Sequence, residues 1–164
     1  MGAALALRVT ADHPDRVAGV VLVNAAVATE RWDVKLLPVL KYLVPSRPGI
    51  GNDIKKPGAD EHCYERTPLK ALHSMMRAWK PLIEDLPRVT APILYFRSAE
   101  DHVVDISSSR ALHAGLSSKD FEERVLDNSY HVATLDNDAP QLFAASVGWI
   151  RARVPAAAPQ VEGR

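Results

Sequence analysis

The sequence predicts an α/β protein in which a parallel sheet of about three strands is flanked by helices. Residues 17–24 form a nearly continuous, valine-rich apolar run, which is typical of a strand buried on both faces of a parallel sheet. Residues 92–96 form a second short apolar run, residues 121–126 read as a third short strand, and segments with helical spacing alternate with all three. This order describes part of an α/β sandwich with right-handed crossovers.

The first helix is expected over residues 1–11, which are apolar on most sides. A helix of this kind is normally buried within a larger structure. No Ser, Thr, Asp or Asn stands before its first turn as a cap, which is unusual for the true start of a polypeptide. Residues 12–15 end the helix at a proline, and the first strand follows.

Residues 26–79 are predicted to be a helical insertion between the first two strands. Residues 32–43 have the spacing of one amphipathic helix or two short ones, ended by Pro45, and residues 68–79 return to helical spacing. The stretch 46–56 between them is expected to be a loop, and no clear strand pattern occurs in the insertion. Most of its apolar side chains are expected to pack, and some can also line a cleft.

The rest of the chain completes the α/β pattern. After a short helix or turn at 81–87, a helix is expected at 106–116 between the second and third strands, and a closing helix at 140–154. The expected domain organisation is a core of residues 1–25 and 80–154, the insertion of residues 26–79, and a disordered tail of residues 155–164.

Composition excludes several classes of protein. The chain has 164 residues, enough for one domain, and 20 basic residues balance 20 acidic ones, so nothing favours nucleic acid or an anionic membrane as a partner. No signal peptide or membrane-spanning run is visible, and the single cysteine, Cys63, fits a reducing compartment, so a cytoplasmic location is expected. We expect Cys63 to be half-buried. The spacing of His62, Cys63 and His73 matches no usual zinc pattern, so no metal or cofactor is predicted.

Two residues that follow neighbouring predicted strands are candidates for catalysis. Asp101 comes shortly after the strand at 92–96, and His131 follows the strand at 121–126. Because parallel strands end at the same edge of a sheet, these side chains can form two thirds of a hydrolytic triad. Asp101 could instead cap the next helix, although Asp105 is better placed to do so, and His102 and Asp105 are expected at the surface.

Three stretches then suggest a family. Glu100-Asp101-His102-Val103-Val104, the segment 128–136 (Asn-Ser-Tyr-His-Val-Ala-Thr-Leu-Asp) and the segment 51–57 (Gly-Asn-Asp-Ile-Lys-Lys-Pro) resemble the α/β-hydrolase superfamily, in its branch of bacterial monoacylglycerol lipases and small carboxylesterases. The opening Met1-Gly2-Ala3-Ala4 fits the same family. The resemblance runs from residue 1 to about 153 and implies the later half of the hydrolase fold, with residues 26–79 as its cap.

The resemblance also implies a mechanism and a missing part. In the family a G-x-S-x-G turn exposes the nucleophilic serine, and Met1-Gly2 would be the residues that follow it, but no serine here stands in that context. His131 would be the general base, Asp101 its orienting acid and the Met1 amide an oxyanion donor, while Glu61 would hold the polar head of an ester or monoacylglycerol. We therefore expect a fragment that is inactive or nearly so by itself.

Two other functions remain open from the sequence. The chain could be a non-catalytic binding or interaction module, or its fold could act on thioesters, haloalkanes or epoxides. If strands are missing before residues 17–24, the bare edge of that strand would favour a homo-oligomer or aggregation. Charges at residues 122–124 indicate that the third strand also has a half-exposed edge.

Overall fold

The computed structural model describes residues 1–154, and its centre is a parallel sheet of three strands. The strands are β1 (Val20–Val23), β4 (Ile93–Ser98) and β5 (Phe121–Leu126), in the spatial order β1-β4-β5. Val20 pairs with Ile93, and Ile93 pairs in turn with Phe121, so all three strands start at one level. The predicted fold class and all three core strands are confirmed. The predicted tail, residues 155–164, lies outside the described residues.

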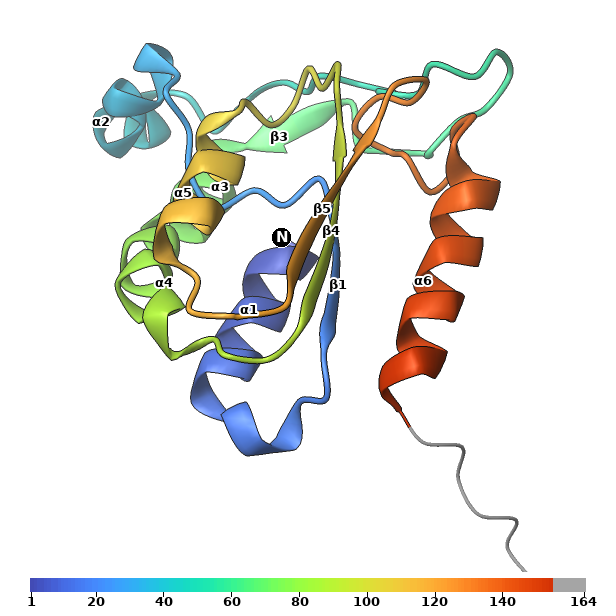
Figure 1. The fold of residues 1–164 in the computed structure, drawn as a ribbon. Coiled ribbons are helices and arrows are strands. Elements are labelled where there is room, and N and C mark those ends of the chain that lie inside the picture. The colour runs from blue at the N-terminus through green and yellow to red at the C-terminus, as the bar shows by residue number, and fades with distance from the viewer. Residues whose placement is uncertain (155–164) are drawn as a thin grey trace, which may run out of the picture.

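Helices cover the two faces of this sheet unequally (Figure 1). One group of helices packs on one face, and the closing helix packs on the other. The first group is α1 (Gly2–Asp12), α4 (Trp79–Asp85) and α5 (Ser107–Gly115), and the single helix is α6 (Ala139–Arg153). Each begins and ends within two residues of its expected position, and the largest shift is that of α4, which begins and ends two residues before the helix or turn expected at 81–87.

The sheet divides the apolar core into two clusters. On the three-helix side, Leu7, Leu22, Leu86, Ile93, Tyr95 and Leu112 are fully buried. On the α6 side, Leu94, Phe96, Leu126, Leu142 and Trp149 pack together. Alternate residues of β4 serve the two clusters because successive side chains of a strand point to opposite faces. The central strand, buried on both faces, is therefore the common wall of the core.

The segment between β1 and β4 differs from the prediction in one respect. It contains η2 (Trp32–Leu36), α2 (Leu37–Leu43) and α3 (Leu69–Arg77), as the helical spacing predicts, but also a small antiparallel sheet. Its strands are β2 (Ser46–Pro48) and β3 (Arg66–Pro68), so the prediction of no strand here was wrong. Each strand has three residues and ends in a proline, which leaves no room for a visible alternation of apolar and polar residues.

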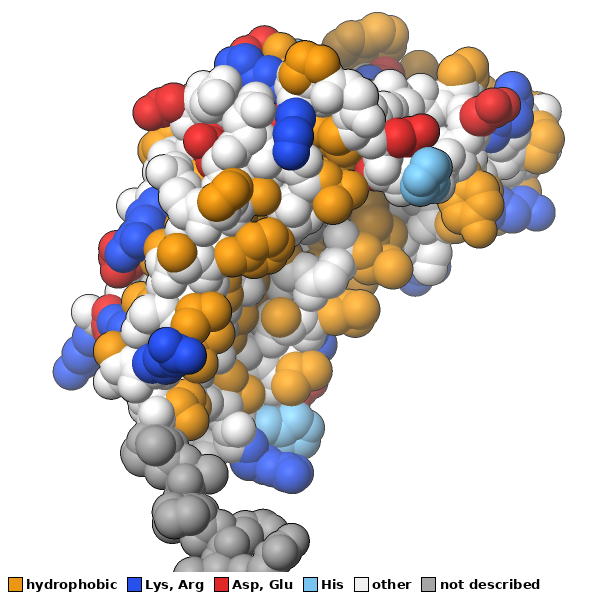
Figure 2. Space-filling view, turned by 90° about the vertical axis from the view of Figure 1, so that its right-hand side faces the viewer, with side chains coloured by type: hydrophobic (Ala, Val, Ile, Leu, Met, Phe, Trp, Pro, Cys, Tyr) orange, Lys and Arg blue, Asp and Glu red, His pale blue; other side chains and the backbone are white. Residues whose placement is uncertain are grey.

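The edge of β1 remains open within the described residues, because β1 pairs only with β4. Val20 and Leu22 are buried but Val21 and Val23 are only partly so, which corrects the expected burial on both faces. Leu5 and Val9 of α1 are more than half exposed, so the described residues cover only part of the apolar surface of this helix. Figure 2 shows apolar side chains gathered on the α6 side, where Phe143, Val147 and Ile150 are exposed.

No helix within residues 1–154 is both long enough and apolar enough to cross a membrane.

Candidate functional site

The structure brings Asp101 and His131 together. The Nδ1 atom of His131 lies 2.9 Å from Oδ2 of Asp101, while Oδ1 of Asp101 accepts hydrogen bonds from the amides of Val103 and Val104, each at 2.8 Å. Asp101 thus closes its own turn and also holds the imidazole, but it does not cap the next helix, which begins at Ser107. The Asp101 side chain is 6% exposed and that of His131 28%, so the carboxylate is shielded and the ring is accessible. With Nδ1 occupied as a donor, Nε2 is free to accept a proton.

Asn24, directly after β1, holds the His131 loop in place through hydrogen bonds from its side chain. Its side-chain Nδ2 donates to the backbone carbonyls of His131 at 2.8 Å and Tyr130 at 3.3 Å, and its Oδ1 accepts from the Ser98 amide at 2.7 Å. Asn24 has a φ of 44°, a left-handed conformation that asparagine tolerates better than most residues. Sequence reasoning did not select Asn24. A polar residue directly after a buried strand is the signal that could have found it.

Asp136 joins the His131 loop to the segment of residues 51–61. Its buried carboxylate accepts hydrogen bonds from the backbone N–H groups of Lys55, Lys56 and Tyr130, at 2.7–2.9 Å. Burial raises the pKa of Asp136, but these amides and that of Asn137 outweigh it and hold the pKa below its usual value. The anion is therefore the form that the fold requires.

Asp53, from the same segment, joins the loops that carry the two candidate residues. Its Oδ1 lies 2.6 Å from Nδ1 of His102, and its Oδ2 accepts from the backbone amides of His131 at 3.1 Å and His102 at 3.3 Å. The hydrogen bond to Asp53, with a smaller contribution from the Glu100 charge, raises the pKa of His102 against the opposing effect of burial. His102 is exposed, as expected, with about half of its side chain accessible, and its ring is at the same time bound to Asp53.

Asp105, the other residue expected at the surface, is less exposed than His102. It is partly buried, its Oδ1 accepts from the Ser107 amide at the start of α5, and its Oδ2 accepts from Thr29 Oγ1 at 2.7 Å. The preference for Asp105 over Asp101 as the residue that starts this helix is consistent with the first of these bonds. The second bond ties the β4 loop to the beginning of the insertion.

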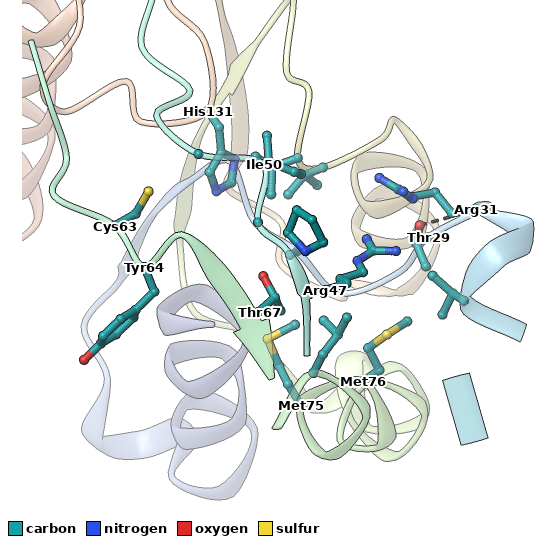
Figure 3. Close-up of a pocket in the computed structure, with 18 of the residues that line it drawn as sticks. Thr29, Arg31, Arg47, Ile50, Cys63, Tyr64, Thr67, Met75, Met76 and His131 are labelled. Atoms are coloured by element: carbon teal, nitrogen blue, oxygen red, sulfur yellow. Dashed lines mark hydrogen bonds between the residues drawn. The ribbon is translucent and has the colours of Figure 1, made fainter. Parts of the chain in front are cut away.

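His131 faces a largely apolar cavity of about 350 Å³ (Figure 3). In Figure 3 the imidazole points into the cavity, and Met75 and Met76 of α3 reach toward it from the opposite side. The lining also includes Ala28, Val34, Ile50, Leu72, Trp79 and Val103. Such a volume and lining are typical of a site for a small apolar ligand.

Polar side chains stand at intervals around this cavity. Glu61 is among the lining residues, and its backbone amide donates to Asn52 Oδ1 at 3.1 Å, which fixes the turn that presents it. Arg31 and Arg47 lie together at the side of the cavity away from His131 (Figure 3), and both pair with Asp33 at 2.9 Å. Cys63 also lines the cavity but is exposed, so the prediction that it is half-buried was wrong.

Met1 precedes α1 and is 72% exposed. The helix runs opposite to β1, so its first turn lies toward the end of the sheet at which β1 finishes (Figure 1). Two serines contact the His131 loop, but both hydroxyls are engaged: Ser98 Oγ donates to the Tyr130 carbonyl at 2.7 Å, and Ser129 Oγ lies 2.9 Å from Asp138 Oδ2. Within residues 1–154, no three His, Cys, Asp or Glu side chains are grouped to hold a metal ion.

Known proteins are similar to this chain in both sequence and fold. A model of the serine aminopeptidase S33 family matches residues 1–138. The thermostable monoacylglycerol lipase of Bacillus sp. (strain H-257) is 38% identical over 152 residues, which cover 90% of this chain and 58% of that protein. The chain thus spans less than two thirds of the length of this relative.

Solved structures give the same result. One, from a study of the metagenome-derived lipolytic enzymes LipS and LipT, superposes with a TM-score of 0.87 at 38% identity, covering 93% of this chain and 62% of that one. The monoacylglycerol lipase of Paleococcus ferrophilus, at 22% identity and a TM-score of 0.76, shares the fold and covers 93% and 65%. The chain therefore belongs to the serine aminopeptidase S33 family of α/β-hydrolases.

Proposed function

We propose that this chain provides the catalytic base, its orienting acid and the acyl pocket of a serine hydrolase that acts on carboxylic esters, with monoacylglycerols as the substrate class. The observation that carries the proposal is the Asp101–His131 pair, which is shielded on the carboxylate side and open to an apolar cavity on the imidazole side. Lipolytic relatives at 38% identity support the choice of ester chemistry.

In the proposed reaction, Nε2 of His131 takes the proton of a serine hydroxyl while the serine oxygen attacks the ester carbonyl. His131 then returns that proton to the leaving alcohol, and Asp101 stabilises the imidazolium in between. The serine itself is proposed to come from polypeptide beyond these 164 residues, because the sequence contains no G-x-S-x-G. Without it the chain is expected to be inactive, since loss of the triad serine alone costs on the order of a millionfold in turnover.

Met1 is proposed to complete the oxyanion hole. If a residue precedes it, its nitrogen becomes a backbone amide at the positive end of the α1 dipole, where developing negative charge is stabilised. One donor of this kind typically lowers the barrier by about 3 kcal/mol.

The cavity supports a neutral, amphiphilic substrate. Leu72, Met75 and Met76 offer apolar contacts for an acyl chain, and the carboxylate of Glu61 can accept hydrogen bonds from glycerol hydroxyls. The two guanidinium groups at the far side share the carboxylate of Asp33, whose pKa their hydrogen bonds hold far below the usual range. The carboxylates of Asp33 and Glu61 together balance the charges of Arg31 and Arg47, so this part of the cavity has no excess positive charge to favour an anionic head group.

Residues 26–79 are proposed to be the cap of this hydrolase, because α3 and the β2–β3 pair supply much of the cavity wall. The open edge of β1 is proposed to be covered by further strands of the hydrolase fold, and a second copy of the chain is the alternative occupant. A cytoplasmic location is proposed from the single exposed cysteine.

The experiment compares the 164-residue chain with a fusion in which the first half of an S33-family hydrolase, ending in Gly-x-Ser, precedes Met1. A fluorophosphonate probe should label the fusion alone, and only the fusion should hydrolyse a monoacylglycerol. Replacing the added serine by alanine in the fusion should abolish both signals. Turnover by the 164-residue chain alone at the rate of the fusion would contradict the proposal.

A non-catalytic binding module is the second candidate, because residues of this chain by themselves line the 350 Å³ cavity. It predicts that the 164-residue chain binds a monoacylglycerol and that the fusion gains no hydrolysis.

A further inference from the structure

The carboxylate of Asp53 contacts the backbone of His131 and leaves the imidazole to Asp101. Its Oδ2 atom lies 3.1 Å from the His131 amide nitrogen, and the Asp53 carbonyl accepts from the next amide, that of Val132, at 3.1 Å. Two consecutive amides of the loop are therefore bound by one residue of the insertion. This residue is only 5% exposed, so water does not compete effectively for these bonds.

The same carboxylate also binds the loop that carries Asp101. Oδ2 accepts from the His102 amide at 3.3 Å, and Oδ1 lies 2.6 Å from the His102 ring, next to Asp101 in the sequence. One anion thus fixes the two loops relative to each other. The distance between Asp101 and the His131 ring depends on that relative position.

Removing Asp53 would leave donors of both loops without an acceptor. A buried amide that loses its acceptor is unfavourable, so the loops would move to find water or another partner. A shift of about 1 Å in such a loop is enough to cost roughly 100-fold in the rate of a positioned reaction. Asp136, in contrast, binds Tyr130 and the insertion but makes no hydrogen bond to His131 or to the Asp101 loop.

We propose that Asp53 is a positioning residue for His131. By binding the loops after both β4 and β5, it holds the His131 ring in hydrogen-bond contact with Asp101, with Nδ1 protonated and Nε2 free. This also couples the insertion to the Asp101–His131 pair. The catalytic consequence rests on the proposed function, whereas the state of the ring can be measured on this chain by itself.

The test is nitrogen-15 NMR of the histidine rings in the 164-residue chain, above the pH at which they are protonated. The correlation pattern distinguishes the Nδ1–H tautomer from the Nε2–H tautomer, which predominates in free histidine. Wild-type His131 should be in the Nδ1–H form. Asp53→Ala should give a mixture of tautomers, and Asp53→Asn, which keeps one acceptor oxygen, a smaller change.

Asp105→Asn is the matched control. Asp105 also ties the β4 loop to the insertion, through Thr29 Oγ1, but makes no hydrogen bond to His131. The control should leave the His131 tautomer unchanged. If Asp53→Ala does not fold, by circular dichroism, the comparison of Asp53→Asn with Asp105→Asn decides.

A folded Asp53→Ala chain whose His131 stays fully in the Nδ1–H form would overturn the proposal, and so would a wild-type His131 in the Nε2–H form. In the fusion, Asp53→Asn should lower kcat by about 10-fold or more while KM changes little. An inactive parent fusion would count against the proposed function, whereas the NMR result on the chain alone decides the role of Asp53.

Discussion

The insertion between β1 and β4 has two parts that are held in opposite ways. Residues 51–61 are anchored to the loops at the strand ends by two buried carboxylates, Asp53 and Asp136. Residues 32–43, which form η2 and α2, expose Trp32, Tyr42 and Leu43 by about three quarters. Directional hydrogen bonds to buried anions fix positions closely, whereas a few apolar contacts permit sliding. The difference suggests that the first part maintains the site and the second can adjust to what enters it.

The largest effect should come from breaking the anchored part. Asp136→Ala removes the acceptor of four backbone amides in a buried position, and we expect the free energy of unfolding to fall by about 3 kcal/mol. Urea unfolding followed by circular dichroism measures it. The exposed Asp60, changed to alanine, is the control and should alter stability little. An Asp136→Ala chain as stable as this control would remove the basis of the comparison.

A smaller loss is expected at Leu37, the one buried residue of α2. Leu37 is 4% exposed, and Leu37→Ala should lower the free energy of unfolding by about 2 kcal/mol, since it leaves a cavity. The same urea experiment measures the loss. A value near zero would mean that α2 is not packed against the rest of the molecule at all.

The two parts should also respond to pH with opposite signs. The pKa of His102 is raised above its ordinary 6.5, chiefly by Asp53. The contribution of His102 to the free energy of unfolding is therefore complete below pH 6.5 and is lost as the pH rises through the raised value. The pKa of His73, which accepts from Lys41 between α2 and α3, is lowered by burial, Lys41 and Arg77. The contribution of His73 to the free energy of unfolding is therefore complete above pH 6.5 and is lost as the pH falls through the lowered value.

Amide NMR spectra across this pH range provide the measurement. Alkaline pH should perturb residues 51–61 first, and acid pH should perturb α2. His102→Gln and His73→Gln should each remove one response and keep the other. Perturbation of both parts at the same end of the range would contradict the assignment.

The smallest effect belongs to the exposed side chains of η2 and α2. Trp32→Ala and Leu43→Ala remove side chains that are 74% and 75% exposed, and each should change stability by less than about 0.5 kcal/mol. If this part adjusts to a ligand, these substitutions should change the free energy of monoacylglycerol binding to the 164-residue chain, measured by calorimetry, more than they change the free energy of unfolding. Large losses of stability would show that it is as firmly held as residues 51–61.

Local sequence patterns predicted the strands and helices whose formation depends on residues close together in the sequence. The strand at 121–126 and the helices near 107–115 and 139–153 follow from short-range periodicity, and β5 has the predicted bounds. Asp101 and His131 could be selected because each follows a recognisable strand within a familiar motif. The sequence could not reveal that two neighbouring polar residues also form hydrogen bonds, His102 with Asp53 and Asp105 with Thr29.

The missed residues act through contacts that are distant in the sequence. Asn24 binds the carbonyl of His131, 107 residues away, and Asp53 binds His102, 49 residues away. Nothing in the local sequence distinguishes such an aspartate from the exposed Asp60 nearby. The sequence therefore predicted that His102 is exposed but not that it binds Asp53, and the three-residue strands β2 and β3 were missed because their pairing is equally non-local.

The central claim is that His131 is the base of a serine hydrolase, and it is tested most directly by ester turnover in the fusion that carries the serine. His131→Ala should reduce kcat by about 10⁴-fold or more, with partial recovery when free imidazole is added. A reduction of less than about 10-fold would contradict the claim, because a triad acts as a unit.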